Sequence, residues 1–256
     1  MKTIFLIAKN TFKETIRNKI LYTILFFGIL IIALSRLLAD VSAGENEKII
    51  QDVGISSISF FATLICILAG INLVYNEIDR RTIYTILSKP VKRYQFLLGK
   101  YLGLSFSLLM IVLAMTAIFV LYLLWNQIHP HPAIFQAIFL EFMTILLIAA
   151  FAILFSSITT PLLSAIFTVF LYIVGNTLYT VKLAEQQAIL QKGWIQTIFK
   201  TLYHFLPNLH NFNMKVYASH KMMMPLPDFL SAIAYGIVYT TLVLILAIAI
   251  FHSRNF

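Results

Sequence analysis

Long apolar runs, separated by short polar stretches, make up most of the chain. A charge at the centre of a bilayer costs about 2.5 kcal/mol or more, so a charge-free run of roughly 20 residues predicts a membrane-spanning helix. Transmembrane strands are about 10 residues long and alternate in polarity, which these runs do not. We therefore predict an all-α polytopic membrane protein with six spans at residues 20–39, 54–75, 101–125, 133–155, 161–181 and 229–251.

Two of the apolar runs are twice as long as one span needs. Residues 101–140 carry no charge, and neither do residues 142–181. Prolines and polar side chains interrupt the first run at residues 125–132 and the second at residues 156–161, and such clusters predict turns. Each run therefore contains a boundary between two helices.

Composition supports a lipid environment for this fold. Of the 256 residues, 60% are hydrophobic and only 11% are charged, whereas soluble domains carry about 25% charged residues. The net charge of +9 comes largely from basic residues beside apolar runs. At such positions basic residues orient a membrane protein and bind anionic lipid, so we do not expect a nucleic-acid partner.

The distribution of basic residues predicts the orientation. Residues 1–19 and 76–100 are net basic and residues 40–53 are net acidic. Because basic segments stay in the cytoplasm, we expect both termini inside the cytoplasmic membrane. The connection 182–228 then lies outside although it is net basic, and long connections follow this rule less strictly. It forms either a lid on the outer face of the protein or a tether between two spans.

The N-terminal segment 1–19 predicts an amphipathic helix lying in the membrane interface beside lipid phosphates. Its basic residues recur every fourth position at Lys9, Lys13 and Arg17. The apolar face consists of Met1, Phe5, Ala8, Phe12 and Ile16. The helix either anchors the chain only or also touches a cytoplasmic partner.

The strip 76–100 joins the second and third spans. Its acids precede its bases, which suits the dipole of a short helix. Ile83, Ile86 and Leu87 form one apolar face, and Pro90 ends the helix because the preceding residue is disfavoured in the α conformation. A short helix at 77–90 with an apolar face suits docking into a partner's groove, although another interfacial helix is the alternative.

This strip resembles the segment between the second and third spans of ABC type-2 permeases. Its specific part is about 25 residues long, and the six-span layout extends the resemblance over the whole chain. Arg81 departs from it, since the family often has glycine before the threonine. The matching residues are Glu77, Thr82, Ile86-Leu87, Pro90-Val91, Arg93 and Gly99-Lys100.

The resemblance implies the permease subunit of an ATP-driven exporter. Two permease copies would enclose a path, and separate cytoplasmic ABC ATPase subunits would bind ATP and Mg²⁺. The chain contains no G-x-x-x-x-G-K-[ST] phosphate loop, so we expect no enzymatic activity and no cofactor of its own. The implied coupling surface consists of Glu77, Arg80, Arg81, Thr82, Ile83, Ile86, Leu87 and Pro90.

Two other classes of function stay open. A mechanical membrane subunit would use the same fold to act on an outer protein partner. An ion-coupled secondary transporter usually shows inverted repeats and broken helices, and no internal repeat is visible here. The sequence does not identify a substrate.

Glu141 is the acid placed well inside a span, about 12 Å from the start of its helix. Arg36, near the outer end of the first span, is its expected partner. The two residues form either a structural ion pair or part of a substrate or proton site.

The outer side also carries histidines and methionines that could bind a soft metal. Their spacings match no ligand motif, so we predict no metal site. The residues concerned are His129, His131, His204, His210, His220, Met222, Met223 and Met224.

Overall fold

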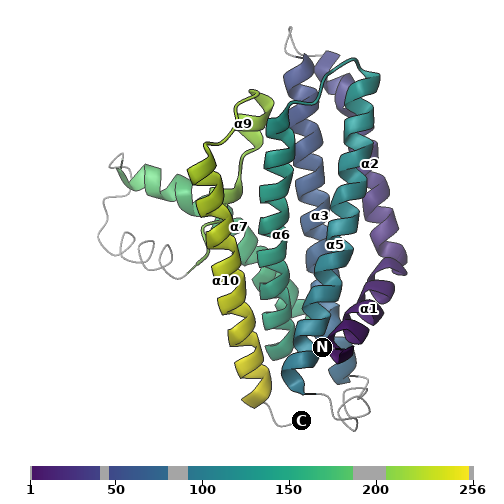
Figure 1. The fold of residues 1–256 in the computed structure, drawn as a ribbon, viewed down its shortest axis with the longest axis vertical. Coiled ribbons are helices and arrows are strands. Elements are labelled where there is room, and N and C mark those ends of the chain that lie inside the picture. The colour runs from purple at the N-terminus through teal and green to yellow at the C-terminus, as the bar shows by residue number, and fades with distance from the viewer. Residues whose placement is uncertain (1, 41–45, 80–91, 187–205, 254–256) are drawn as a thin grey trace.

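The computed structural model describes residues 2–40, 46–79, 92–186 and 206–253. Helices account for nearly all of this part of the chain, and it contains no strand. The helices, labelled as in Figure 1, are α1 (Lys2–Ile16), α2 (Lys19–Asp40), α3 (Asn46–Asp79), α5 (Arg93–Trp125), α6 (Pro132–Ile158), α7 (Pro161–Gln186), η1 (Leu209–Phe212), α9 (Lys215–Ser219) and α10 (Leu226–Ser253).

Six of these helices, α2, α3, α5, α6, α7 and α10, are long and apolar enough to cross a membrane. This confirms the predicted all-α fold with six membrane-spanning helices. With 34 and 33 residues, α3 and α5 are each about 50 Å long, more than the roughly 30 Å hydrocarbon core requires. The predicted spans 54–75 and 101–125 lie inside them, because flanking charged residues continue each helix beyond the hydrocarbon.

The long helices run between two ends of the bundle, which we call lower and upper as drawn in Figure 1. Helix α1 begins and α10 ends at the lower end, while α9 and the turn between α5 and α6 lie at the upper end. Helix α1 lies against the lower part of α5, and α7 leans outward. The lower end therefore brings together elements from both termini and the middle of the chain.

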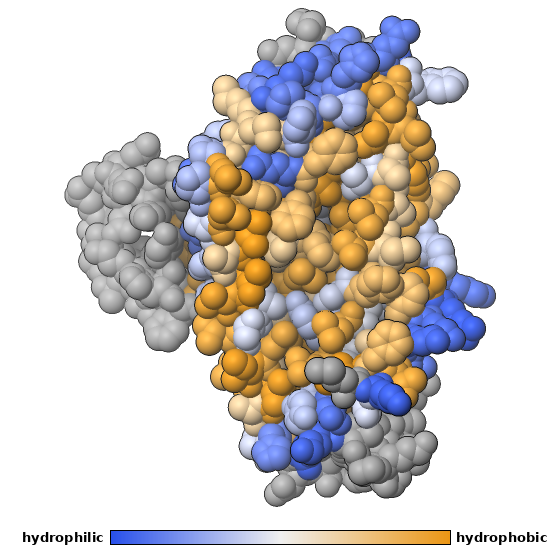
Figure 2. Space-filling view, viewed as in Figure 1, coloured by the Kyte–Doolittle hydropathy of each residue, from blue (hydrophilic) through white to orange (hydrophobic). Residues whose placement is uncertain are grey.

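Helix α6 lies at the centre of the bundle. It is apolar on all sides, as expected of a helix surrounded by others, and it packs against α3, α5, α7 and α10. In Figure 2, apolar residues cover the middle of the molecule and polar residues gather toward its ends. This distribution matches a protein whose sides face lipid and whose ends face water.

Both predicted turns lie where the polar clusters stand. In the first, Gln127 adopts a positive φ of 59° and His131 caps α6 by accepting a hydrogen bond from the Ala133 amide. Pro132 occupies the first turn of α6, where its missing N–H costs nothing. In the second, α6 ends at Ile158 and α7 starts at Pro161. The polar clusters thus mark real helix boundaries.

The N-terminal helix α1 packs small polar residues against the bundle. Thr11 and Thr15 are its buried residues, whereas Phe5 is 69% exposed. Phe5 therefore faces away from the bundle, whereas Phe12 contacts Phe106 of α5 with ring centroids 5.0 Å apart. A small-residue surface of α5, described below, explains the choice, because bulky rings would prevent the helices from approaching.

Only part of the connection 182–228 falls within the described residues. Residues 187–205 lie outside them. After them the chain forms η1, whose first amide groups are capped by the Asn208 side chain, and then α9. Leu209 and Phe212 are buried, so this part packs onto the bundle.

Candidate functional site

The predicted coupling surface begins where α3 ends. Glu77 lies in the last turn of α3. The other residues of that surface, Arg80, Arg81, Thr82, Ile83, Ile86, Leu87 and Pro90, lie outside the described residues. Besides Glu77, the described part of the motif is Arg93, Gly99 and Lys100, at the start of α5.

Arg93 ties the start of α5 to the end of α10. Its guanidinium donates hydrogen bonds to the carbonyl oxygens of Phe251, at 3.2 Å, and His252, at 3.0 Å. The last carbonyls of a helix have no partner within the helix and carry partial negative charge. Phe96 stacks on Phe251 with ring centroids 6.0 Å apart. The two helix ends are therefore joined by both charge and apolar contact.

Gly99 and Gly103 bring α1 into close contact with α5. A Cβ atom on Gly99 would lie 2.7 Å from Cβ of Ile7, and one on Gly103 would lie 2.5 Å from the backbone oxygen of Ala8. With the buried Ser107, these residues form a stripe of small side chains at every fourth position. Such stripes let helix backbones approach closely within a membrane.

Lys100 reaches from this stripe to the N-terminal helix. Its Nζ lies 3.4 Å from Oε2 of Glu14 and 5.8 Å from the centroid of the Phe96 ring. The lysine side chain is 2% exposed and that of Glu14 is 53% exposed. A buried ammonium needs such a partner because its desolvation is costly. We call Glu14, Arg93, Phe96, Gly99, Lys100 and Gly103 the lower junction.

A second charged cluster lies deeper, toward the upper end, where α3, α6, α7 and α9 meet. Ser59 donates a hydrogen bond of 2.5 Å to Oε1 of Glu141. Nζ of Lys215 donates to Oγ of Ser59 at 2.7 Å and lies 3.8 Å from Oε2 of Glu141. Tyr172 lies close enough to interact with both Glu141 and Ser59. We call these four residues the upper cluster.

The upper cluster holds its acid away from solvent. The Glu141 side chain is 8% exposed and that of Lys215 is 22% exposed. A buried carboxylate is tolerated when a countercharge and hydrogen bonds replace its water. Ser59 supplies a bridge between the two charges, so one neutral side chain serves both.

The predicted pairing of Glu141 with Arg36 is not observed. Arg36 is exposed near the upper end and donates a 2.5 Å hydrogen bond to Oδ1 of Asn126. Lys215 takes its place, because the fold returns the connection 206–225 onto α3 and α6. The signal in the sequence was Lys215 itself, a basic residue in the connection between the fifth and sixth spans.

Further polar contacts fasten the region around α9 to the bundle. Lys221 and Glu47 form an exposed ion pair of 2.7 Å. The Gln136 side chain exchanges hydrogen bonds of 2.9 and 3.3 Å with the backbone of Met224. His210 is partly buried, and this desolvation lowers the pKa of its imidazole. The segment is therefore held to α3 and α6 at several points.

The described residues contain no group of three or more His, Cys, Asp or Glu side chains placed to share a metal ion. His131 serves as the cap of α6, and His220 is exposed beside α9. His204 lies outside the described residues. The site chemistry visible in this part of the chain is ion pairing and helix packing.

Comparison with protein families gives one match, to the family described as ABC-2 family transporter protein, over residues 5–256. Comparison with curated protein sequences gives no match. The match spans almost the whole chain and agrees with six candidate spans and the motif at the start of α5. The chain therefore belongs to the ABC-2 transporter family, whose members are the membrane subunits of ABC transporters and work with an ABC ATPase subunit.

Proposed function

We propose that this chain is the permease subunit of an ATP-driven exporter in the cytoplasmic membrane. Two copies, or this chain and a similar one, enclose the path, and separate ATPase subunits bind and hydrolyse ATP with Mg²⁺. Both termini and the lower end face the cytoplasm, because α1 with its basic residues lies in the lower half of the bundle and the strip that connects α3 to α5 is net basic in sequence. The substrate is left open.

The lower junction is the observation that supports this proposal most strongly. Segment 77–90, the proposed docking surface, is continuous with α3 on one side and with α5 on the other. Just after it, Arg93 joins α10 and Lys100 joins α1 through Glu14. A push on the segment from an ATPase would therefore move α3 and α5, and with them α1 and α10, as a domain-level transition requires.

The upper cluster has a complementary role in this proposal. It holds the outer connection against α3 and α6 through one buried ion pair. Opening the path outward would separate Lys215 from Glu141, and a buried charge without its partner is unfavourable. The pair would thus favour the closed outer side until ATP-driven movement separates it.

The proposal is tested by co-expressing the chain with its ATPase and purifying the complex into vesicles. The chain alone is expected to hydrolyse no ATP, and the complex is expected to do so. Ile86→Asp places a charge on the apolar docking face and is expected to abolish co-purification or the effect of the permease on ATPase rate. Ile86→Leu keeps an apolar side chain of equal size and serves as the matched control.

Two results would contradict the proposal. One is robust ATPase activity from the single purified chain. The other is an Ile86→Asp complex that assembles and responds as the Ile86→Leu complex does. Either result leaves the family assignment in place and removes the docking role of segment 77–90.

A mechanical subunit that acts on an outer protein is the second candidate. The tight packing of residues 206–225 favours it, since Leu209, Phe212 and Ala218 are buried against the bundle. A cross-link introduced between α9 and α3 distinguishes the two. It should block flux of any substrate in an exporter, whereas a mechanical subunit would lose only the effect on its outer partner.

A further inference from the structure

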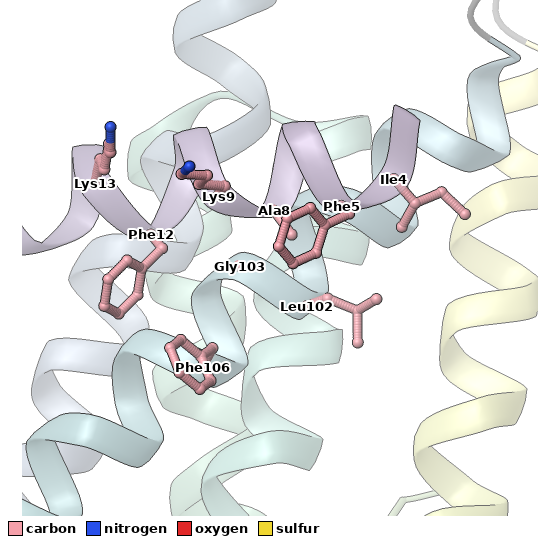
Figure 3. Close-up of a pocket in the computed structure, with 9 residues that line it drawn as sticks. All are labelled: Ile4, Phe5, Ala8, Lys9, Phe12, Lys13, Leu102, Gly103 and Phe106. Atoms are coloured by element: carbon pink, nitrogen blue, oxygen red, sulfur yellow. The ribbon is translucent and has the colours of Figure 1, made fainter. Parts of the chain in front are cut away.

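A groove of about 660 Å³ lies between α1 and α5 on the side of the bundle. Its volume falls within the range of about 300–1,000 Å³ that is usual for ligand pockets. Gly103 is among the residues that line the groove, and Phe12 and Phe106 close it on one side with ring centroids 5.0 Å apart. Figure 3 shows these residues around the opening.

The groove is apolar and open to the surroundings of the bundle. Phe5 is 69% exposed, Phe106 is 51% exposed and Leu102 is 49% exposed. All three belong to surfaces that an interfacial helix and a spanning helix turn toward lipid. The natural surroundings of such a surface are hydrocarbon chains.

Two cations stand at the edge of this apolar groove. Lys9 and Lys13 are exposed and one helical turn apart on α1, so both can reach one ligand. In Figure 3, Lys13 points away from α5 whereas Phe12 points toward Phe106. No acid is among the described residues that line the groove, and the neighbouring Glu14 is paired with Lys100.

We propose that this groove binds one anionic phospholipid. An acyl chain lies along Phe5, Gly103 and Phe106, and the phosphate lies between Lys9 and Lys13. The apolar lining of the groove then contacts the acyl chain of the lipid, and the two lysines contact its phosphate. Lysine binds phosphate through charge-assisted hydrogen bonds, and each lysine near an anionic surface contributes about 1 kcal/mol.

Occupation of the groove would have a structural consequence. The lipid would contact both α1 and α5 beside Gly103, where the two backbones approach each other most closely. It would therefore stabilise the attachment of α1 to the lower junction. The proposal does not depend on the direction of transport or on the docking surface, since it uses only residues of α1 and α5.

The test places a fluorescent reporter in the groove. The Phe106→Trp variant of the full chain, with any ATPase that co-purifies, is reconstituted into phosphatidylcholine vesicles. These contain equal fractions of either dibromo-acyl phosphatidylglycerol or dibromo-acyl phosphatidylcholine in both leaflets. Bromine quenches tryptophan on contact, and quenching of the native tryptophans is subtracted using the chain without the substitution.

Phosphatidylglycerol is expected to occupy the groove about thirtyfold more tightly than phosphatidylcholine, as two lysine contacts imply. Adding Lys9→Gln and Lys13→Gln should reduce this preference to within about twofold. The matched control changes Lys2→Gln and Lys19→Gln, which removes the same charge from exposed residues outside the groove. It should keep the preference.

A second variant tests whether the lipid needs the open volume of the groove, apart from the charge of the two lysines. Ala8→Phe adds a ring to the groove lining and keeps both lysines, so both brominated lipids should quench less. Equal quenching by the two lipids in the reporter chain would overturn the proposal, as would an equal loss in both lysine double variants. Absence of quenching by either lipid in the assembled complex would show a protein partner in the groove and would also overturn it.

Discussion

Two of the lysine–glutamate pairs in the described residues have one enclosed partner, one pair at each half of the bundle, and the enclosed partner differs between them. In the lower pair, the Lys100 ammonium is enclosed and Glu14 is 53% exposed. In the upper pair, Glu141 is enclosed and Lys215 is 22% exposed, with Ser59 bridging both charges. In the lower pair, Glu14 is therefore in contact with water. In the upper pair, both side chains are largely shielded from it.

The difference has a mechanical meaning. An exposed Glu14 can shift with α1 and stay solvated, whereas the buried Lys100 must keep a partner, so the lower pair ties α1 to α5 while its outer half stays in water. In the upper pair, Ser59 and the opposite charge replace water around both Glu141 and Lys215. Separating the two residues would leave the Glu141 carboxylate buried without a partner, which is unfavourable. We infer that the lower junction transmits movement and that the upper cluster resists it.

Breaking the upper pair should have the largest effect. Lys215→Met leaves the Glu141 carboxylate buried without a countercharge, and we expect a loss of about 3–5 kcal/mol in the free energy of unfolding. Cys66, the single cysteine, is buried, so its reaction with a maleimide dye on heating reports unfolding.

The control for this variant is an ion pair with a shorter distance. Lys221 and Glu47 are 2.7 Å apart but 50% and 44% exposed, and Lys221→Met should cost less than about 1 kcal/mol. Adding Glu141→Gln to Lys215→Met should recover most of the lost stability. Equal effects of Lys215→Met and Lys221→Met would remove the distinction drawn between buried and exposed pairs.

The next effect concerns the packing of α1 on the lower junction. Gly103→Ala places a methyl group 2.5 Å from a backbone oxygen of α1, which must move away. We expect a loss of about 1–3 kcal/mol and increased protease cleavage of α1. Gly28→Ala is the matched control, because its nearest atom at 2.7 Å is the flexible end of Met115. A Gly103→Ala protein as stable as Gly28→Ala would show that close approach at α1 is unimportant.

Glu14→Gln should have a smaller effect than either. It removes the countercharge of Lys100 but leaves an exposed polar group that can still accept a hydrogen bond, so we expect a cost of about 1 kcal/mol. The free energy of unfolding should change little, whereas the stimulation of the ATPase rate by the permease should fall clearly. A cost as large as that of Lys215→Met would mean that the two pairs do not differ.

The smallest expected effect is a pH dependence of the outer segment. Burial lowers the pKa of His210 in the folded state, so the unfolded chain binds more protons near its ordinary pKa of about 6.5. Stability therefore falls as pH drops through about 6.5 and levels off below the lowered folded pKa. Thermal unfolding at pH 7.5 and 5.5 should show a smaller difference in His210→Asn than in the wild-type chain.

The number and order of the spanning helices could be predicted from the sequence, because each apolar run responds to lipid independently of its neighbours. The turns at residues 125–132 and 156–161 were also predictable, since proline and polar side chains act locally. The bounds of the helices were harder to predict. Helices α3 and α5 extend past their apolar runs into charged residues, which are compatible with either helix or loop.

The sequence alone determined that this chain is an all-α membrane protein with six spans, a basic N-terminal helix and the motif of its family. Only the tertiary structure decided which charges meet. It paired Glu141 with Lys215 rather than Arg36, placed Lys100 on Glu14, and turned Thr11 rather than Phe12 toward Gly103. Partition into lipid depends on local composition, whereas ion pairing and close packing depend on which distant segments the fold brings together.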